Sequence, residues 1–88
     1  MDDREVEARV QARLRRARET LAMTQRLREE PSRENVAALH ELHARHLREV
    51  GEHERADRAD ERARTERALL RDGTRRSGAL RIGAVDAR

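Results

Sequence analysis

The stretch EEPSRENVAALHELHARHLREVG, residues 29–51, contains the signals that divide this 88-residue chain into helices. Pro31 lacks an amide hydrogen and disfavours a helical conformation in the residue before it, so a helix arriving from the N-terminal side ends near Glu29. Ser32 is the natural cap of a second helix, because its side-chain oxygen can accept a hydrogen bond from a free amide of the first turn. A loop this short places two helices antiparallel, so the sequence predicts a helical hairpin.

The aliphatic residues on either side of this loop recur mostly three or four positions apart, which is helical rather than strand spacing. We expect the first helix to begin with a cap at Asp2 or Asp3 and to run to about Glu29. Its predicted buried stripe is Val6, Val10, Leu14, Ala17 and Leu21, with Leu27 beside it. The second helix is predicted to bury Val36, Leu39, Leu42, Leu47 and Val50 on one side.

Gly51 leaves two arrangements open. Glycine costs about 1 kcal/mol relative to alanine inside a helix, so Gly51 either ends the second helix or is tolerated within one long helix, residues 33–71. Gly73 is the expected end of the helical region, which gives a domain of residues 1–72 and a basic, glycine-containing tail of residues 73–88. The predicted fold is all-α, either an antiparallel helical hairpin or a three-helix arrangement, with this C-terminal tail.

Part of the chain, ALHELHARHLREVGEHERADRADERA at residues 38–63, matches the register of a known helical repeat. The residues that fall in this register are Ala44, Leu47, Gly51, Ala56 and Ala63. On these positions, residues 34–66 resemble a single tetratricopeptide-type (TPR-like) helical hairpin. The large aromatic packing positions of that repeat are occupied here by His40, Leu47, Arg48 and Ala59, and no second copy follows. The resemblance implies a protein-binding module without catalytic chemistry.

The chain has little apolar material for a core of its own. Residues 2–72 contain thirteen large aliphatic side chains, and the sequence has no Phe, Tyr, Trp or Cys. A domain of this size has a thin core even with a normal share of large apolar residues. A second copy would supply apolar surface, so we expect a homo-oligomer, most simply a dimer. The predicted interface residues are Val10, Leu14, Leu21, Leu39, His43, His46, Leu47 and Val50.

Catalytic and membrane classes have little support. Without cysteine there is no disulfide or thiolate chemistry. The sequence also lacks a glycine-rich phosphate loop and a serine in a nucleophile-elbow pattern. No apolar run approaches the roughly 20 residues that span a bilayer. We therefore expect a cytoplasmic protein that is not an enzyme, binds no cofactor and makes no membrane contact.

Histidines form the only cluster with metal-ligand character. Residues three apart on a helix can share a metal, which makes His40, His43 and His46 candidate zinc ligands. Each step of three residues turns a helix back by about 60°, so one helix spreads these three rings over about 120° of its surface. Packed or interfacial histidines, paired with nearby Glu or Arg, are therefore favoured, and no metal is predicted.

Net charge is concentrated at the C-terminal end. Residues 1–72 carry seventeen arginines and seventeen acidic residues, whereas residues 73–88 carry four arginines and one acidic residue. Arginine can bind a phosphate through two N–H groups, so the tail offers a phosphate contact or a docking segment. The residues predicted for this role are Arg75, Arg76, Leu80, Arg81 and Ile82.

These observations predict a small adaptor, a non-catalytic protein–protein interaction or assembly module that binds a protein partner through its aliphatic helix stripes and basic tail. The alternative is a small dimeric nucleic-acid-binding regulator that uses the Arg-rich tail. Nucleic-acid binders usually show a basic face on their folded part. The balanced charge of residues 1–72 therefore favours the adaptor.

Overall fold

The computed structural model describes the backbone of residues 2–86 and the side chains of residues 2–73. Three helices follow one another along the chain: α1, Asp3–Glu29; α2, Arg33–Glu49; and α3, His53–Asp86. The described residues contain no strand. The predicted all-α fold is confirmed, and of the two arrangements left open by the sequence the chain adopts the three-helix one.

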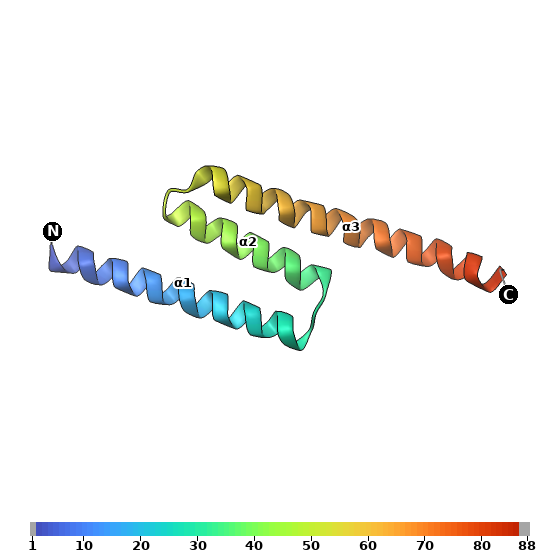
Figure 1. The fold of residues 1–88 in the computed structure, drawn as a ribbon, viewed down its shortest axis with the longest axis horizontal. Coiled ribbons are helices and arrows are strands. Elements are labelled where there is room, and N and C mark those ends of the chain that lie inside the picture. Colours follow the sequence, from blue (N-terminus) through green and yellow to red (C-terminus); the bar gives the residue numbers. More distant parts are fainter. Residues whose placement is uncertain (1, 87–88) are drawn as a thin grey trace.

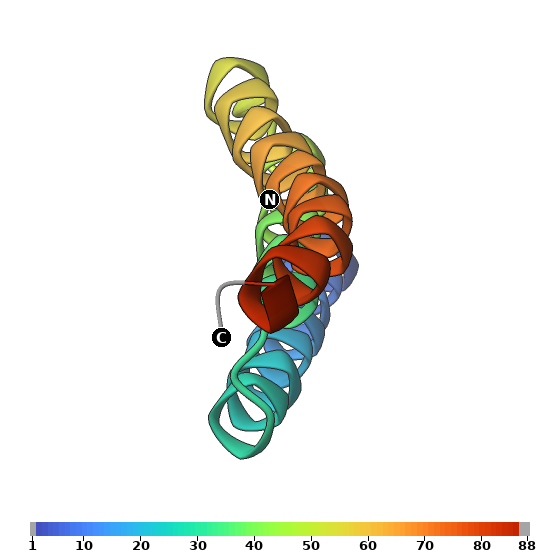
Figure 2. The same ribbon diagram turned by 90° about the vertical axis from the view of Figure 1, so that its right-hand side faces the viewer.

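The three helices form a single layer. Figure 1 shows a zigzag in which α2 lies in the middle and runs antiparallel to both α1 and α3, and the end-on view in Figure 2 shows a layer one helix thick. The chain measures 71 × 27 × 10 Å, with a radius of gyration of 18.7 Å. A compact domain of this length would have a radius of gyration of about 12 Å. Each helix therefore exposes much of its surface.

Both predicted helix caps are present. The Asp2 carboxylate accepts a hydrogen bond from the amide two residues further on, at 3.3 Å, and the Ser32 hydroxyl accepts one from the Asn35 amide, at 3.1 Å. The first helix ends at Glu29, as Pro31 predicted. A contact that the sequence did not reveal reinforces the loop, because the side-chain amide of Asn35 donates to the carbonyl oxygen before Pro31, at 2.7 Å.

Gly51 ends α2 because it adopts a left-handed backbone conformation, with φ of 82°. Its amide donates to the carbonyl oxygen of Arg48 at 3.1 Å, and the next amide, of Glu52, donates to the carbonyl oxygen of Leu47 at 2.8 Å. These two bonds form a Schellman motif, which satisfies the last carbonyl groups of the helix. The chain therefore reverses direction at this glycine, and α3 runs back alongside α2.

Substitution of the two described glycines should have opposite effects on stability. At Gly51, alanine should lower the free energy of unfolding by about 1 kcal/mol or more, because a Cβ is strained at this positive φ. At Gly73, inside α3, alanine should raise it by about 0.5–1 kcal/mol through better helix propensity. Neither new Cβ would meet an atom within 4 Å, so only the backbone differs. Urea unfolding monitored by circular dichroism measures both changes, and equal effects would contradict the expectation.

The prediction that the helical region ends at Gly73 is wrong, because α3 continues to Asp86. Unlike Gly51, Gly73 lacks the positive φ that closes a helix. A glycine inside a long helix costs only about 1 kcal/mol, which the flanking turns can tolerate. The side chains predicted for tail docking or phosphate contact lie outside the described residues; they are Arg75, Arg76, Leu80, Arg81 and Ile82.

The core lies between α2 and α3. Alanine dominates it, and its buried apolar residues are Ala37, Ala44, Ala56, Ala59 and Ala63, with Leu42 and Leu47. Small side chains allow two helices to approach closely, but they bury little area each. No residue of α1 is buried. The α2–α3 hairpin is therefore the packed part of the molecule, and α1 is attached to one side of it.

Candidate interaction surface

The face of α1 that meets α2 is only half-buried. Its partly covered residues recur every three or four positions along the helix, which defines a stripe; they are Ala12, Arg16, Glu19, Met23, Thr24 and Leu27. Only two of these side chains are large and apolar. Apolar burial therefore contributes less to this contact than to the α2–α3 hairpin.

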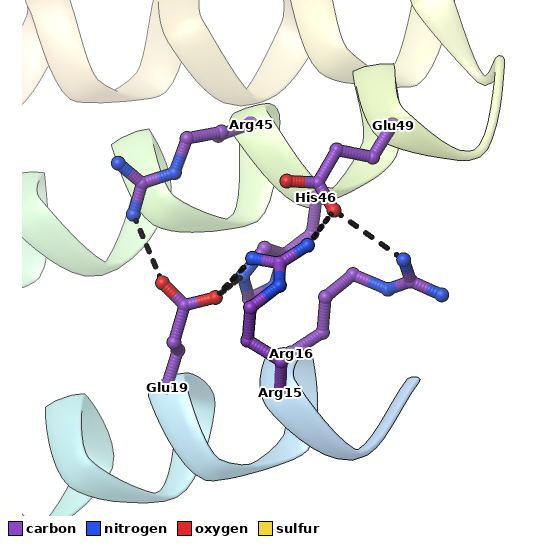
Figure 3. Close-up of polar contacts among 6 residues, drawn as sticks. All are labelled: Arg15, Arg16, Glu19, Arg45, His46 and Glu49. Carbon is purple, nitrogen blue, oxygen red and sulfur yellow. Dashed lines mark hydrogen bonds and ion pairs between the residues drawn. The ribbon is translucent and has the colours of Figure 1, made fainter. Parts of the chain in front are cut away.

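Ion pairs connect α1 to the last turn of α2, as Figure 3 shows. Glu49, the last residue of α2, accepts hydrogen bonds from Arg15 at 2.6 Å and Arg16 at 3.3 Å. One turn further along α1, Glu19 lies 3.5 Å from the guanidinium of Arg45 and 3.3 Å from Nε2 of the buried His46. The pairing of His46 with a glutamate agrees with the expectation for interfacial histidines. The partners of these pairs between helices are 26 to 34 residues apart in the sequence.

Two guanidinium groups stabilise the ionised form of Glu49. The hydrogen bond from Arg15 is the main cause of a lowered pKa at this carboxyl group, and the bond from Arg16 adds to it. The same contact raises the pKa of Arg15. Exposed ion pairs contribute about 0–1 kcal/mol each, and salt screens them. The network therefore positions α1 on α2 without adding a large core.

The aliphatic side of α1 is exposed. The exposed fractions are 43% for Val6, 49% for Val10, 45% for Leu14 and 59% for Leu21, and Ala17 is also exposed. We call these five residues the aliphatic stripe. The predicted burial of this stripe is wrong within the single chain, because Arg16 and Glu19 lie on another face of α1 and attach that face to α2. The most apolar side of α1 thus remains available.

A groove adjoins the stripe where α1 meets α2. It is an open hollow of about 550 Å³, and we call it the α1–α2 groove. Its lining residues are Arg13, Arg16, Ala17, Thr20, Leu21 and Thr24 from α1, with His43, His46, Leu47 and Val50 from α2. No acidic residue is among them. The groove therefore combines an apolar floor with arginine and histidine side chains.

The structure brings five of the eight predicted interface residues together. Leu21, His43, His46, Leu47 and Val50 all line the α1–α2 groove. Among them, His46 and Leu47 are buried, whereas the other three are exposed. The remaining three lie elsewhere: Val10 and Leu14 belong to the aliphatic stripe, and Leu39 is half-buried on α2.

The candidate zinc ligands point to different sides of α2. His43 and His46 line the α1–α2 groove, and His46 pairs with Glu19. His40 lines a separate hollow with residues of α3, including Glu61. No group of three or more His, Cys, Asp or Glu side chains suited to a metal ion occurs among residues with described side chains.

Acidification should destabilise the fold through His43. His43 is exposed but partly desolvated by its neighbours, and this partial desolvation is the main cause that lowers its pKa below the ordinary value of 6.5; the charges of Arg55, His40, His46 and Arg62 add to it. Because the unfolded chain then binds the proton more tightly, stability present above about pH 6.5 is lost as the pH falls. Urea unfolding at about pH 7.5 and about pH 5.5 measures the loss. His43→Gln should show a smaller loss, and an equal loss in both proteins would contradict the assignment.

In the part of the chain that the structure describes, no helix is both long enough and apolar enough to cross a membrane. Comparison of the chain with protein families, curated proteins and solved structures finds no match.

Proposed function

We propose that this protein is a non-catalytic interaction or assembly module, a small adaptor that binds protein surfaces through α1. The observation that carries the proposal is the exposure of the aliphatic stripe. Val6, Val10, Leu14 and Leu21 are each more than two-fifths exposed on a helix that is otherwise rich in charge. Contiguous apolar surface bordered by polar residues marks interaction sites in water-soluble proteins.

The packing of the α2–α3 hairpin is a second observation that supports the same proposal. The small residues that carry the resemblance to a tetratricopeptide-type hairpin include Ala44, Ala56 and Ala63, and all three are buried where α2 meets α3. In this proposal the hairpin is a rigid support, because buried alanines hold its helices close together. It presents α1, whose exposed side chains would contact the partner.

Photo-crosslinking in cells that produce the full chain tests this function. A benzophenone amino acid replaces Leu14 in one variant and Ala22 in a control, because both positions are exposed on α1 but only Leu14 belongs to the aliphatic stripe. We expect adducts of discrete mass from position 14 and none from position 22. An adduct with this chain or with another protein supports the module.

A second variant shows whether the adduct depends on the apolar surface. Val10→Gln, added to the position-14 probe, removes one aliphatic side chain without a change in charge and should reduce the yield. Ala8→Gln, at an exposed position outside the stripe, should leave the yield unchanged. If position 14 gives no more adduct than position 22 in the folded protein, the proposed function is overturned.

The alternative, a nucleic-acid-binding regulator, is supported only by the charge of residues 73–88. Phosphate contacts would make retention on immobilised DNA or RNA fall steeply with salt. Replacement of Arg75, Arg76 and Arg81 by Gln should then abolish retention. If the variant and the wild type elute at the same salt concentration, this alternative is excluded.

A further inference from the structure

We infer that the partner surface is a second copy of this chain, bound through antiparallel pairing of the two α1 helices around a twofold axis near Leu14. In this dimer the N-terminal turns of each α1 lie over the α1–α2 groove of the other copy. This inference rests on the proposed function and names the partner of the same surface. It follows from the position, spacing and charge of residues on α1.

The N-terminal part of α1 extends beyond α2. Glu49 is the last residue of α2, and it pairs with Arg15 and Arg16. Figure 1 shows the N-terminal end of α1 projecting past the α2–α3 turn. Residues 3–11, which are all exposed, make up about 14 Å of helix at 1.5 Å per residue. We call residues 3–11 the overhang.

The overhang and the groove share one apolar face. Successive members of the aliphatic stripe are three or four residues apart, so they lie on one face of the helix. This face continues without a break from Val6 and Val10 in the overhang to Ala17 and Leu21 in the groove. From Val6 to Leu21 it measures about 23 Å. Because α1 is one continuous helix, the overhang cannot fold back onto the groove of its own chain. A second copy can place it there.

Antiparallel pairing makes this face self-complementary. With the twofold axis near Leu14, Val6 of one copy lies opposite Leu21 of the other, and Val10 lies opposite Ala17. The twofold axis repeats each contact, as an isologous interface requires. Small Ala17 and the apolar groove floor beside it leave room for a valine. The aliphatic stripe of one copy therefore covers the aliphatic stripe of the other.

Charge selects the antiparallel orientation. Residues 2–10 carry four acidic residues and two arginines, whereas residues 11–18 carry four arginines and no acidic residue. Antiparallel pairing brings the acidic segment of each copy toward the basic segment and toward the groove, which has no acidic side chain among its lining residues. Parallel pairing would place like charges opposite each other, which is destabilising.

Glu7 and Arg18 are expected to form a specific ion pair between the two copies. They are eleven residues apart, which is close to three full turns, so both lie along one edge of α1. In a twofold antiparallel pair the same edges meet, which places Glu7 of one copy near Arg18 of the other. Both side chains are exposed within the single chain.

Cysteine cross-linking of the purified full chain tests the orientation, and the native sequence has no cysteine to interfere. Val6→Cys and Leu21→Cys are prepared with tags of different mass, mixed and oxidised. A disulfide needs Cβ atoms about 3.5–4.5 Å apart. We expect at least about tenfold more mixed dimer than either self-linked dimer, because only position 6 lies opposite position 21. Dominant self-linked dimers would indicate parallel pairing and overturn the inference.

Sedimentation equilibrium measures the affinity of the dimer, and variants of Glu7 and Arg18 test whether this charge pair contributes to it. Glu7→Arg and Arg18→Glu should each weaken dimerisation by about tenfold, since each change creates two like-charge contacts per dimer. The double variant should regain affinity within about threefold of the wild type, because both pairs are restored in reverse. A wild-type chain that stays monomeric, or a double variant no stronger than the single ones, overturns the inference. Photo-crosslinks to another protein would then still support the proposed function.

Discussion

Leu47→Ala should lower the free energy of unfolding by about 2–5 kcal/mol, the range for removal of a buried leucine side chain. Leu47 is 8% exposed and belongs to the buried cluster with Ala44, Ala56 and Ala59, where it is the only large side chain. A protein of this length has a total stability of about 4–13 kcal/mol. The loss should therefore be a large fraction of the whole, visible as a lower urea midpoint in circular dichroism.

Leu69→Ala is the matched control. Leu69 lies in α3 and is 44% exposed, so the same substitution removes little buried surface and gains helix propensity. Its effect should be within about 0.5 kcal/mol of zero. Similar losses for the two variants would show that the α2–α3 contact is not the main source of stability.

Ala56→Leu should also destabilise the protein, by about 1–3 kcal/mol, through overpacking. Ala56 is 0% exposed where α3 approaches α2, and a leucine there would push the helices apart. Separation would also lengthen the ion pairs from Arg48 to Asp57 and Asp60, which join the same ends of the helices. Urea unfolding measures the loss.

Ala68→Leu provides the comparison for overpacking. It makes the same chemical change at an exposed position of α3, where leucine has nearly the helix propensity of alanine. The free energy of unfolding should change by less than about 0.5 kcal/mol. A tolerated leucine at position 56 would indicate that the two helices are not in close contact.

Local chemistry was sufficient to predict where α1 and α2 begin and where α1 ends. Pro31 and Ser32 act on their immediate neighbours, so a single sequence reveals them. Gly51 and Gly73 were harder to separate, because the identity of a glycine does not give its φ. Only at Gly51 does the backbone take the left-handed conformation that ends a helix.

The face by which α1 attaches to α2 could not be predicted from periodicity. The aliphatic stripe has the stronger pattern, yet α1 uses a face that includes Arg16 and Glu19. Their partners Glu49 and Arg45 are remote in sequence, and local spacing contains no information on such pairing. The candidate surface was predictable as a set of aliphatic residues, but its exposure and the groove beside it were not.

The order of helix contacts has a consequence for folding. Among the described residues, α1 and α3 each contact only α2, the neighbour next to them in sequence. Contact order is therefore low, and chains with such topology fold in microseconds to milliseconds. The hairpin of α2 and α3 contains the buried residues, so we expect it to be structured in the folding transition state and α1 to pack against it afterwards. Refolding rates should respond to substitutions in that hairpin and be almost insensitive to those in α1.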